Sequence, residues 1–436
     1  MDLTKSFHPF DIRGDYPAAV NEHMAYLVGK FVQSFLPQGA IVVAADNRES
    51  SPFLVNALVN GLAVGHREVV FIGNVPTPVF YFAVNFLKAA GGVMVTASHV
   101  AGQQNGFKFT KAGALPLDEG EILTLKNFLE SQPADDQRNK SLYKISVEEA
   151  VSNRSKVVSE YITQMVSKFS GLKFPGLVIF DTGETVATPI VEEILSRLTI
   201  SYELLKQRRG LNPLLDEVNL NLREKVKERQ ATLGIIYDGD ADRVVFIDRQ
   251  GNLIPPSYIL GLVAKHFTKV ALDIRSGLAA YTTDHVVTPS WAQNLKFAMS
   301  DDTKIAFAGE TSGHLIFREW YGIDDGIFAG FKFLELVTNL DSELSELRAF
   351  YTDVPEINFE VTGDSTLVLD KIADYYRMKE YPISIIDGVT ITSSDFHLNL
   401  RMSLTEPFLR LNLEVKRPEQ VEAITEEIKK LIYAEK

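Results

Sequence analysis

The chain has 436 residues, of which 45% are hydrophobic and 23% are charged, which predicts a globular protein of two to four domains. Its formal charge of −13 argues against non-specific binding to nucleic acid or anionic membranes, and its lack of cysteine excludes disulfides and thiolate metal sites. Because neither a signal peptide nor a run of about 18 apolar residues occurs, we expect a cytoplasmic protein that does not bind a membrane.

Helices and strands alternate in the first part of the chain. Short apolar strands are predicted at 40–46 and 68–73, and the helix between them begins with Ser51 as a candidate N-cap and Pro52 at the first helical position. A helix is predicted before them, over 21–36. Its apolar positions fall on one face, at Met24, Leu27, Val28, Phe31, Val32 and Phe35. This alternation predicts an α/β sheet with helices on both faces.

The same rhythm restarts twice. A strand at 176–183 precedes a helix at 188–198, and a further strand lies at 269–277. The polar segment 131–144 is predicted to connect the first two units. These segments predict three α/β units of similar size.

The tail has a different pattern. The segments 396–401 and 408–415 alternate apolar and polar residues as half-buried strands do. A helix over 418–432 places Val421, Ile424, Ile428 and Leu431 on one face. We therefore expect a smaller α+β unit at the end of the chain. The expected domains are 1–145, 146–252, 253–353 and 354–436.

The segment 233–248 predicts a metal site. An apolar strand leads into Asp238, Asp240 and Asp242, and the chain leaves as a second apolar strand. In an extended loop such alternate carboxylates point the same way, and three hard oxygen donors suit Mg²⁺. A polar turn capped by aspartates, or an aspartyl-phosphate phosphatase, is the alternative. A calcium EF-hand fits poorly, since Arg243 and Arg249 stand where glycine and glutamate are needed.

Ser98 and His99 lie on the loop that follows the apolar strand at 93–95. A serine hydroxyl is a poor nucleophile unless a base or a metal acts on it. Sequence neighbours need not bring imidazole and hydroxyl together, so an ordinary loop serine is the alternative.

Two later segments suit a phosphorylated sugar. The loop 401–407 carries a guanidinium and two hydroxyls on alternate positions, a set that satisfies phosphate oxygens, with a simple turn as the alternative. The segment 307–317 sets a carboxylate and a hydroxyl between apolar runs, which suits hydrogen bonds to sugar hydroxyls. The candidate residues are Arg401, Ser403 and Thr405 in the first segment and Glu310 and Ser312 in the second.

The ordered set of these motifs is informative. Thr-Ala-Ser-His from 96, Asp-Gly-Asp-x-Asp-Arg from 238, Gly-Glu-x-Ser-Gly-His from 309 and Arg-x-Ser-x-Thr-Glu-Pro from 401 occur one per unit. Together they resemble the α-D-phosphohexomutase superfamily over essentially the whole chain. The closest match looks like the bacterial phosphomannomutase/phosphoglucomutase group, because of "FDIRG" at 10–14, "VPTPVFYFAV" at 75–84 and "YGIDDGI" at 321–327.

This resemblance implies a four-domain enzyme around a central cleft, with three similar α/β domains that have mixed sheets and a smaller C-terminal α+β domain. It implies interconversion of hexose 1-phosphate and hexose 6-phosphate, of mannose, glucose or both. The reaction would pass through a phosphoserine and a hexose 1,6-bisphosphate, which also serves as activator. Ser98 would carry the phosphate, and Mg²⁺ would be held by Asp238, Asp240, Asp242 and an oxygen of that phosphate.

The resemblance also assigns roles to other residues and implies a C-terminal domain that hinges near 352–358. The expected partner is a small phosphosugar, and the expected state is a monomer or a weak homo-oligomer. The implied catalytic residues are Arg13, Ser98, His99, Lys108 and Arg243. The implied substrate-binding residues are Glu310, Ser312, His314, Arg401, Ser403, Thr405 and Arg410.

Several positions depart from the family pattern. Val100-Ala101 stand where the family usually has Asn-Pro, Gln104 replaces a common tyrosine, and Ala45 replaces an arginine. The segment 287–299 lacks the usual basic Thr-Lys-Val-Gly-His sequence. The general acid-base is therefore left open, with Lys296, His314 and Arg318 as candidates.

Three alternatives to this mutase follow from the same residues. The altered loops suit a degenerate member that binds sugar phosphates or a partner without catalysis. A phosphoglucosamine mutase shares the motifs. An aspartyl-phosphate hydrolase would use Asp238 as its nucleophile.

Overall fold

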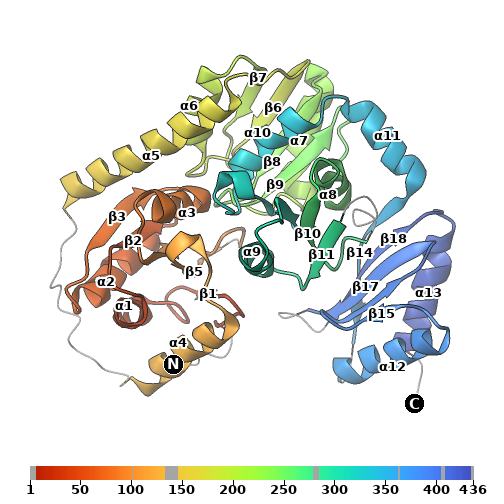
Figure 1. The fold of residues 1–436 in the computed structure, drawn as a ribbon, viewed down its shortest axis with the longest axis horizontal. Helices are drawn as coiled ribbons and strands as arrows, with labels where there is room; N and C mark the ends of the chain where they lie inside the picture. Colours follow the sequence, from red (N-terminus) through yellow and green to blue (C-terminus); the bar gives the residue numbers. More distant parts are fainter. Residues whose placement is uncertain are drawn as a thin grey trace. The chain divides into compact units, whose positions relative to one another are not determined.

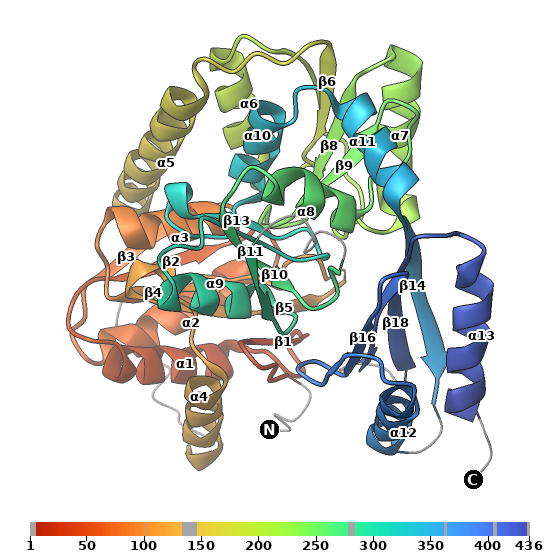
Figure 2. The same cartoon turned by 45° about the vertical axis from the view of Figure 1, so that its right-hand side comes forward.

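The computed structural model describes residues 6–100, 102–132, 146–277, 284–361, 364–403 and 408–433. They form two compact units. The first comprises the chain up to Leu253 together with His314–Glu335, and the second comprises Ile254–Gly313 and the chain from Leu336. Figures 1 and 2 show the elements of each unit from two directions. Within the described ranges, no helix is both long and apolar enough to cross a membrane.

A five-stranded mixed sheet forms the centre of the N-terminal part. Its order is β1-β5-β4-β2-β3, where β2 pairs in parallel with β3 and β4, whereas β5 is antiparallel to β4 and β1. The strands are β1 (Asp11–Asp15), β2 (Ile41–Ala45), β3 (Val69–Asn74), β4 (Gly91–Val95) and β5 (Gln104–Lys111). The predicted strands at 40–46 and 68–73 are thus confirmed.

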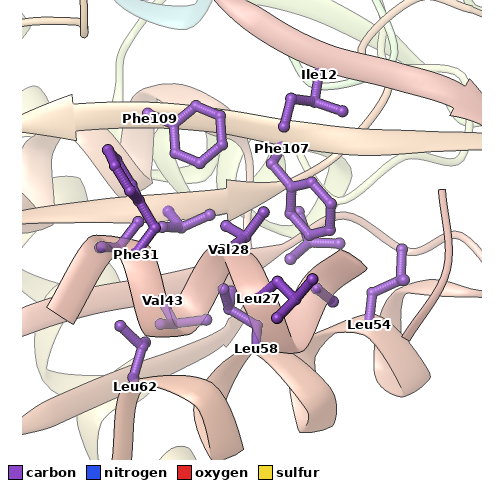
Figure 3. Close-up of a cluster of buried hydrophobic side chains, with 14 of the residues drawn as sticks. Ile12, Leu27, Val28, Phe31, Val43, Leu54, Leu58, Leu62, Phe107 and Phe109 are labelled. Carbon is purple, nitrogen blue, oxygen red and sulfur yellow. The ribbon is translucent and has the colours of Figure 1, made fainter. Parts of the chain in front are cut away.

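Helices cover both faces of this sheet. They are α1 (Glu22–Phe35), α2 (Ser51–Ala63), α3 (Thr77–Phe86) and α4 (Glu119–Ser131). Figure 3 shows the apolar side chains of α1 and α2 packed on one face against β1, β2 and β5, while α3 packs on β2 and β4 from the other side (Figure 1). The backbones of α1 and α2 are in close contact. A Cβ on Gly29 of α1 would lie only 2.2 Å from the Leu58 carbonyl oxygen of α2, so only glycine fits there. The predicted face of α1 is confirmed as core.

The start of α2 differs from the prediction. Its N-cap is Ser50, without a side-chain capping bond, and Pro52 is the second helical residue. The Ser51 hydroxyl donates instead to Asp46 Oδ1 at 2.8 Å. The prediction that Ser51 caps the helix is therefore wrong, because the buried Asp46 carboxylate takes its hydroxyl.

A second mixed sheet belongs to the same unit, in the order β7-β6-β8-β9, with β9 antiparallel to β8. The helix α7 packs on one face. On the other face α10 contributes Phe331 and Phe333, whose rings lie 5.6 Å from Phe180 and 4.2 Å from Phe246. The elements are α5 (Val147–Phe169), β6 (Leu177–Asp181), α6 (Thr188–Arg197), β7 (Ser201–Leu205), α7 (Asp216–Arg229), β8 (Leu233–Tyr237), β9 (Val244–Asp248), β13 (Leu315–Phe317) and α10 (Gly326–Leu336).

The second unit contains a parallel arrangement in which β10 lies between β11 and β12. Its further sheet is antiparallel, in the order β14-β18-β17-β16-β15, and α12 and α13 share one core with it. The first group of elements is α8 (Pro256–Ala264), β10 (Lys269–Asp273), β11 (Asp284–Thr288), α9 (Ala292–Asp301), β12 (Phe307–Gly309) and α11 (Leu340–Phe350). The second is β14 (Thr352–Glu360), α12 (Ser365–Met378), β15 (Ile383–Ser384), β16 (Val389–Thr392), β17 (Phe396–Met402), β18 (Phe408–Val415) and α13 (Gln420–Tyr433).

These elements confirm the predicted α/β parts and the smaller α+β part at the end of the chain. The apolar face predicted for the last helix packs into its core. The segment 352–358 lies in β14, whose register shifts between Val354 and Ile357, and its hinging stays a prediction. The domain boundaries also stay a prediction. Beyond Gln132, the predicted connection at 131–144 lies outside the described residues.

Candidate functional site

The acidic loop between β8 and β9 brings three carboxylates together. It is a tight turn rather than the extended loop we predicted, because Ala241 adopts a left-handed φ of 59°. Asp238, Asp240 and Asp242 are nevertheless fully buried, with ligand oxygens within 4.8 Å of one another. Asp240 Oδ1 and Asp242 Oδ1 have no hydrogen-bond partner among the described residues. This buried set of hard oxygen donors is able to hold a divalent cation.

Lys108, on β5, supplies positive charge to this cluster. Its ammonium group donates to Asp240 Oδ2 at 2.7 Å and also contacts Asp242. Burial lowers the pKa of Lys108, but the two carboxylates outweigh it and raise the pKa above its usual value. Lys108 therefore stays protonated at neutral pH. The pKa of Asp238 is also raised, by its burial and by the neighbouring carboxylates of Asp242 and Asp240.

Ser98 lies directly beside the acidic loop. Its hydroxyl is 3.3 Å from Asp238 Oδ2, and the residue is 2% exposed. The loops pack so closely that a Cβ on Gly239 would lie 2.8 Å from the Ser98 carbonyl oxygen, which only glycine permits. The structure thus brings the predicted nucleophile and the predicted metal ligands together.

His99 Nδ1 lies 3.3 Å from the Ser98 hydroxyl. The charges of Arg243 and Arg13, together with burial, lower the pKa of His99. The imidazole is therefore neutral at neutral pH.

Arg13 and Arg243, the two predicted arginines of this unit, both interact with carboxylates of the acidic cluster. Arg13 lies opposite Gly106 in the β1–β5 pair and interacts electrostatically with Asp240 and Asp242. Arg243 Nε lies 3.8 Å from Asp238 Oδ2 and donates to His314 Nε2 at 2.9 Å.

The sequence reasoning did not identify Asp324 as part of this site. His314 Nδ1 lies 3.4 Å from Asp324 Oδ2 and 3.9 Å from Asp242 Oδ1. Asp242, His314 and Asp324 form a second buried group of possible metal ligands. With Arg243 donating to Nε2, the neutral ring would carry its proton on Nδ1, which favours a hydrogen bond over a metal there.

Two further residues that the sequence reasoning missed fix the acidic loop. The Thr77 hydroxyl, at the start of α3, donates to Asp240 Oδ2 at 2.6 Å. Arg209 donates to Asp181 Oδ1 at 2.8 Å and to the Tyr237 carbonyl oxygen at 2.6 Å, directly before Asp238. No local sequence pattern predicts these contacts, because both residues bond to partners far away in the sequence.

The second unit holds the predicted sugar-binding residues. The Ser312 hydroxyl donates to Glu310 Oε1, and the backbone N–H of Trp291 donates to Glu310 Oε2 at 2.9 Å. Arg275 lies 3.6 Å from Glu310 Oε2 and is paired with Asp273. The carboxylate of Glu310 is thus oriented from several sides, which suits directed hydrogen bonding.

Arg275 belongs to a local sequence pattern, Asp-x-Arg, that occurs three times among the described residues. In each case the arginine Nε donates to Oδ2 of the aspartate, at 2.9–3.0 Å. The pairs are Asp11–Arg13, Asp46–Arg48 and Asp273–Arg275.

Two arginines lie together on the paired strands β17 and β18, next to the predicted phosphate loop. Arg401 on β17 lies directly opposite Arg410 on β18, and Arg410 donates to the Ser403 hydroxyl at 3.2 Å. Burial and nearby Arg275 lower the pKa of Arg401. Glu356 lies 3.2 Å from Arg410 and 3.9 Å from Arg401. Thr405 lies outside the described residues.

The segment 287–299 has an unusual backbone at one residue. Trp291 precedes α9 with a φ of 93°, a conformation that a bulky residue rarely adopts. Lys296 lies buried on α9, and Arg318 is half-buried after β13. The general acid-base therefore stays a prediction, with the same three candidates.

Comparisons with known proteins agree with this arrangement. The chain matches the family described as Phosphoglucomutase/phosphomannomutase, alpha/beta/alpha domain, with domain I over residues 4–134, domain II over 158–251 and domain III over 274–354. It is 30% identical to a phosphomannomutase of Vibrio cholerae, covering 98% of both proteins. It is 31% identical to a phosphomannomutase/phosphoglucomutase of Pseudomonas aeruginosa, covering 96% of this chain and 93% of that protein.

A solved structure shares the fold. The phosphoglucomutase/phosphomannomutase family protein of Burkholderia thailandensis superposes with a TM-score of 0.82 at 24% identity, over 98% of this chain and 97% of that one. The match in sequence extends over the whole chain and the match in fold extends equally far. The chain therefore belongs to the phosphoglucomutase/phosphomannomutase family.

Proposed function

We propose that this protein is a phosphohexomutase that interconverts the 1-phosphate and the 6-phosphate of mannose, glucose or both. One observation carries the proposal. The Ser98 hydroxyl lies 3.3 Å from Asp238 Oδ2, in a buried cluster that also holds Lys108 and Arg243. A serine beside carboxylates and fixed cations is what phosphoryl transfer through a phosphoserine requires.

The reaction has two transfers. The phosphate on Ser98 passes to the free hydroxyl of a hexose monophosphate, so the bond from phosphorus to Ser98 Oγ breaks and a bond to the sugar oxygen forms. The hydroxyl proton goes to a basic group of the protein. The product is the hexose 1,6-bisphosphate, and its other phosphate then returns to Ser98 by the same exchange. Arg13, Lys108 and Arg243 would balance the negative charge of the transferring group.

We propose Mg²⁺ as the cation of the acidic cluster. The residues fit it, because the three carboxylates offer oxygen donors and two of their buried oxygens have no hydrogen-bond partner among the described residues. When bound, the ion would neutralise charge on the transferring phosphoryl group. Asp238, Asp240, Asp242 and an oxygen of the phosphate on Ser98 would hold it.

The residues of the second unit are proposed to recognise the substrate. Glu310 and Ser312 would bind sugar hydroxyls, and Arg401, Ser403, Thr405 and Arg410 would bind the phosphate that is not being transferred. Charge-assisted bonds from arginine forks suit a phosphate dianion. His314 lies beside Arg243 and Asp324 and would act at the transferring phosphate or the sugar.

Turnover separates this proposal from its alternatives. We would follow glucose 1-phosphate and mannose 1-phosphate by ³¹P NMR with the protein, Mg²⁺ and a trace of glucose 1,6-bisphosphate. The expected result is 6-phosphate signals from the wild type and none from Ser98→Ala. Silence from the wild type with both sugars would overturn the proposal and favour a non-catalytic family member. Turnover by Ser98→Ala with loss in Asp238→Asn would favour the aspartyl-phosphate route.

A further inference from the structure

The loop that carries Ser98 is held in an unusual conformation. Ser98 has a φ of 55°, in the left-handed region that residues with a side chain seldom adopt. Such a conformation persists only where the surroundings enforce it, and it is typical of functional sites. The neighbours of Ser98 therefore decide where its hydroxyl points.

Arg48 is one of the residues that hold this backbone in place. Its guanidinium donates to the carbonyl oxygens of Ser98 and Val100, both at 2.8 Å, and to that of Gln104 at 3.0 Å. These three carbonyls lie in the Ser98 loop and at the start of β5. A planar fork of N–H groups meets three acceptors at once, which the single ammonium of lysine cannot reproduce.

Asp46 orients Arg48 and also reaches the other side of Ser98. Asp46 Oδ2 accepts from Arg48 Nε at 2.9 Å and from the Thr96 hydroxyl at 2.8 Å. The same Thr96 oxygen accepts the backbone N–H of Ser98 at 2.8 Å. One buried carboxylate thus links to the N–H of Ser98 through Thr96 and to its carbonyl through Arg48. The other oxygen, Oδ1, accepts from Ser51 and from the Arg48 backbone.

We propose that Arg48 is a positioning residue for the phosphoryl-transfer step, because it holds the peptide of Ser98 so that the hydroxyl faces Asp238. The inference rests on the proposed function. Arg48 acts only through the loop backbone and has no assigned contact with substrate. A displaced nucleophile slows transfer while substrate binding is retained, and a misplacement of about 1 Å lowers the rate by about 100-fold.

The chain offers a matched control for this residue. Arg67 also donates to several carbonyl oxygens of the same domain, those of Gln33 at 2.8 Å, Leu36 at 3.0 Å and Gly39 at 2.9 Å. None of these carbonyls belongs to the Ser98 loop. Arg48→Lys and Arg67→Lys therefore remove comparable contacts at two different places.

The experiment compares both variants with the wild type in kcat, KM, melting temperature and hydrogen exchange of the peptide that carries Ser98. Arg48→Lys should lower kcat by about 100-fold with KM within about threefold, and should speed exchange in that peptide. Arg67→Lys should keep kcat and the exchange rate while it lowers the melting temperature. Should Arg48→Lys fold poorly, Thr96→Val removes one link to Ser98 and should show the same pattern more weakly.

Two results would overturn the inference. One is an Arg48→Lys enzyme with normal kcat, or with a loss of kcat no greater than in Arg67→Lys at equal loss of stability. The other is unchanged exchange in the Ser98 peptide. Because exchange needs no turnover, it tests the hold on the loop even if the wild type proves inactive on every hexose phosphate. That inactivity would instead contradict the proposed function.

Discussion

Lys108 Nζ donates to Asp240 Oδ2 at 2.7 Å, and both residues are buried. The same ammonium contacts Asp242, so one cation balances two carboxylates of the acidic cluster. Removing one partner of a buried ion pair leaves charge uncompensated, which is far more costly than never having the pair.

Lys108→Met should therefore lower the free energy of unfolding by about 3–5 kcal/mol in the absence of a divalent cation. Added Mg²⁺ should raise the melting temperature of this variant more than that of the wild type, because the ion would replace the missing positive charge. Lys111→Met is the control, since Lys111 pairs with Glu121 at the surface. An equal effect of Mg²⁺ on all three proteins would argue against a cation at the acidic cluster.

Arg209 should influence metal affinity although it touches no carboxylate of the cluster. It donates to the Tyr237 carbonyl oxygen at 2.6 Å, next to Asp238, so Arg209→Lys should loosen the loop. We expect the affinity for Mg²⁺ or Mn²⁺ to fall by about tenfold, as is common for residues that support metal ligands. Calorimetry would measure it. Arg223→Lys, which loses a bond to the Gly251 carbonyl oxygen, should bind metal as the wild type does.

Glu356 competes for the arginines proposed to bind phosphate. It lies 3.2 Å from Arg410 and 3.9 Å from Arg401, which are directly opposite each other. Glu356→Gln should therefore tighten binding of inorganic phosphate by up to about fivefold, the size of an exposed ion pair. Glu360→Gln, at the end of the same strand, is the matched control. If Glu356→Gln instead bound phosphate more weakly, the carboxylate would be orienting the arginines rather than competing.

Asp353 makes stability depend on pH in an identifiable direction. Burial raises its pKa from 3.8 to about 6, against the hydrogen bond from Ser257. The folded protein then binds more protons than the unfolded chain between these values, so this residue's contribution falls as pH rises through that window. Asp353→Asn keeps an acceptor for Ser257 without the charge.

The variant should melt at a higher temperature than the wild type at about pH 7.5, and the difference should vanish near pH 4. Thermal unfolding at a series of pH values would measure it. A difference that stays constant with pH, or has the opposite sign at neutral pH, would show that Asp353 is not the group responsible.

Local patterns were sufficient for much of the fold. The apolar face of α1 and the alternation in β18 report directly on burial, because helix and strand periodicities are properties of neighbouring residues. In β17 the polar His397 and Asn399 are buried along with the apolar residues, so the half-buried strand predicted there is wrong. Helix ends were harder, as Ser51 shows, since a tertiary contact with Asp46 decided the role of its hydroxyl. The position of the acidic loop agrees with the prediction, but its backbone conformation does not. The left-handed φ of Ala241 cannot be predicted from the residue type.

The residues of the candidate site also differ in how far the sequence identifies them. Asp238, Asp240 and Asp242 stand at alternate positions of one short segment, so their spacing alone indicates a cluster. Thr77 meets Asp240 across 163 residues and Arg209 meets the Tyr237 carbonyl across 28, and neither contact has a local signature. Such supporting residues become visible only once the strands place their loops at a common edge.

The most direct test is the covalent state of Ser98. The protein would be incubated with glucose 1,6-bisphosphate and Mg²⁺, and the sugar would then be removed. The mass of the intact protein would be measured by mass spectrometry before and after addition of mannose 1-phosphate or glucose 1-phosphate. We expect one added phosphate, mapped to Ser98, that a hexose monophosphate removes as bisphosphate appears. A protein that never gains this phosphate, or gains it at Asp238, would contradict the role of Ser98 as the phosphate carrier.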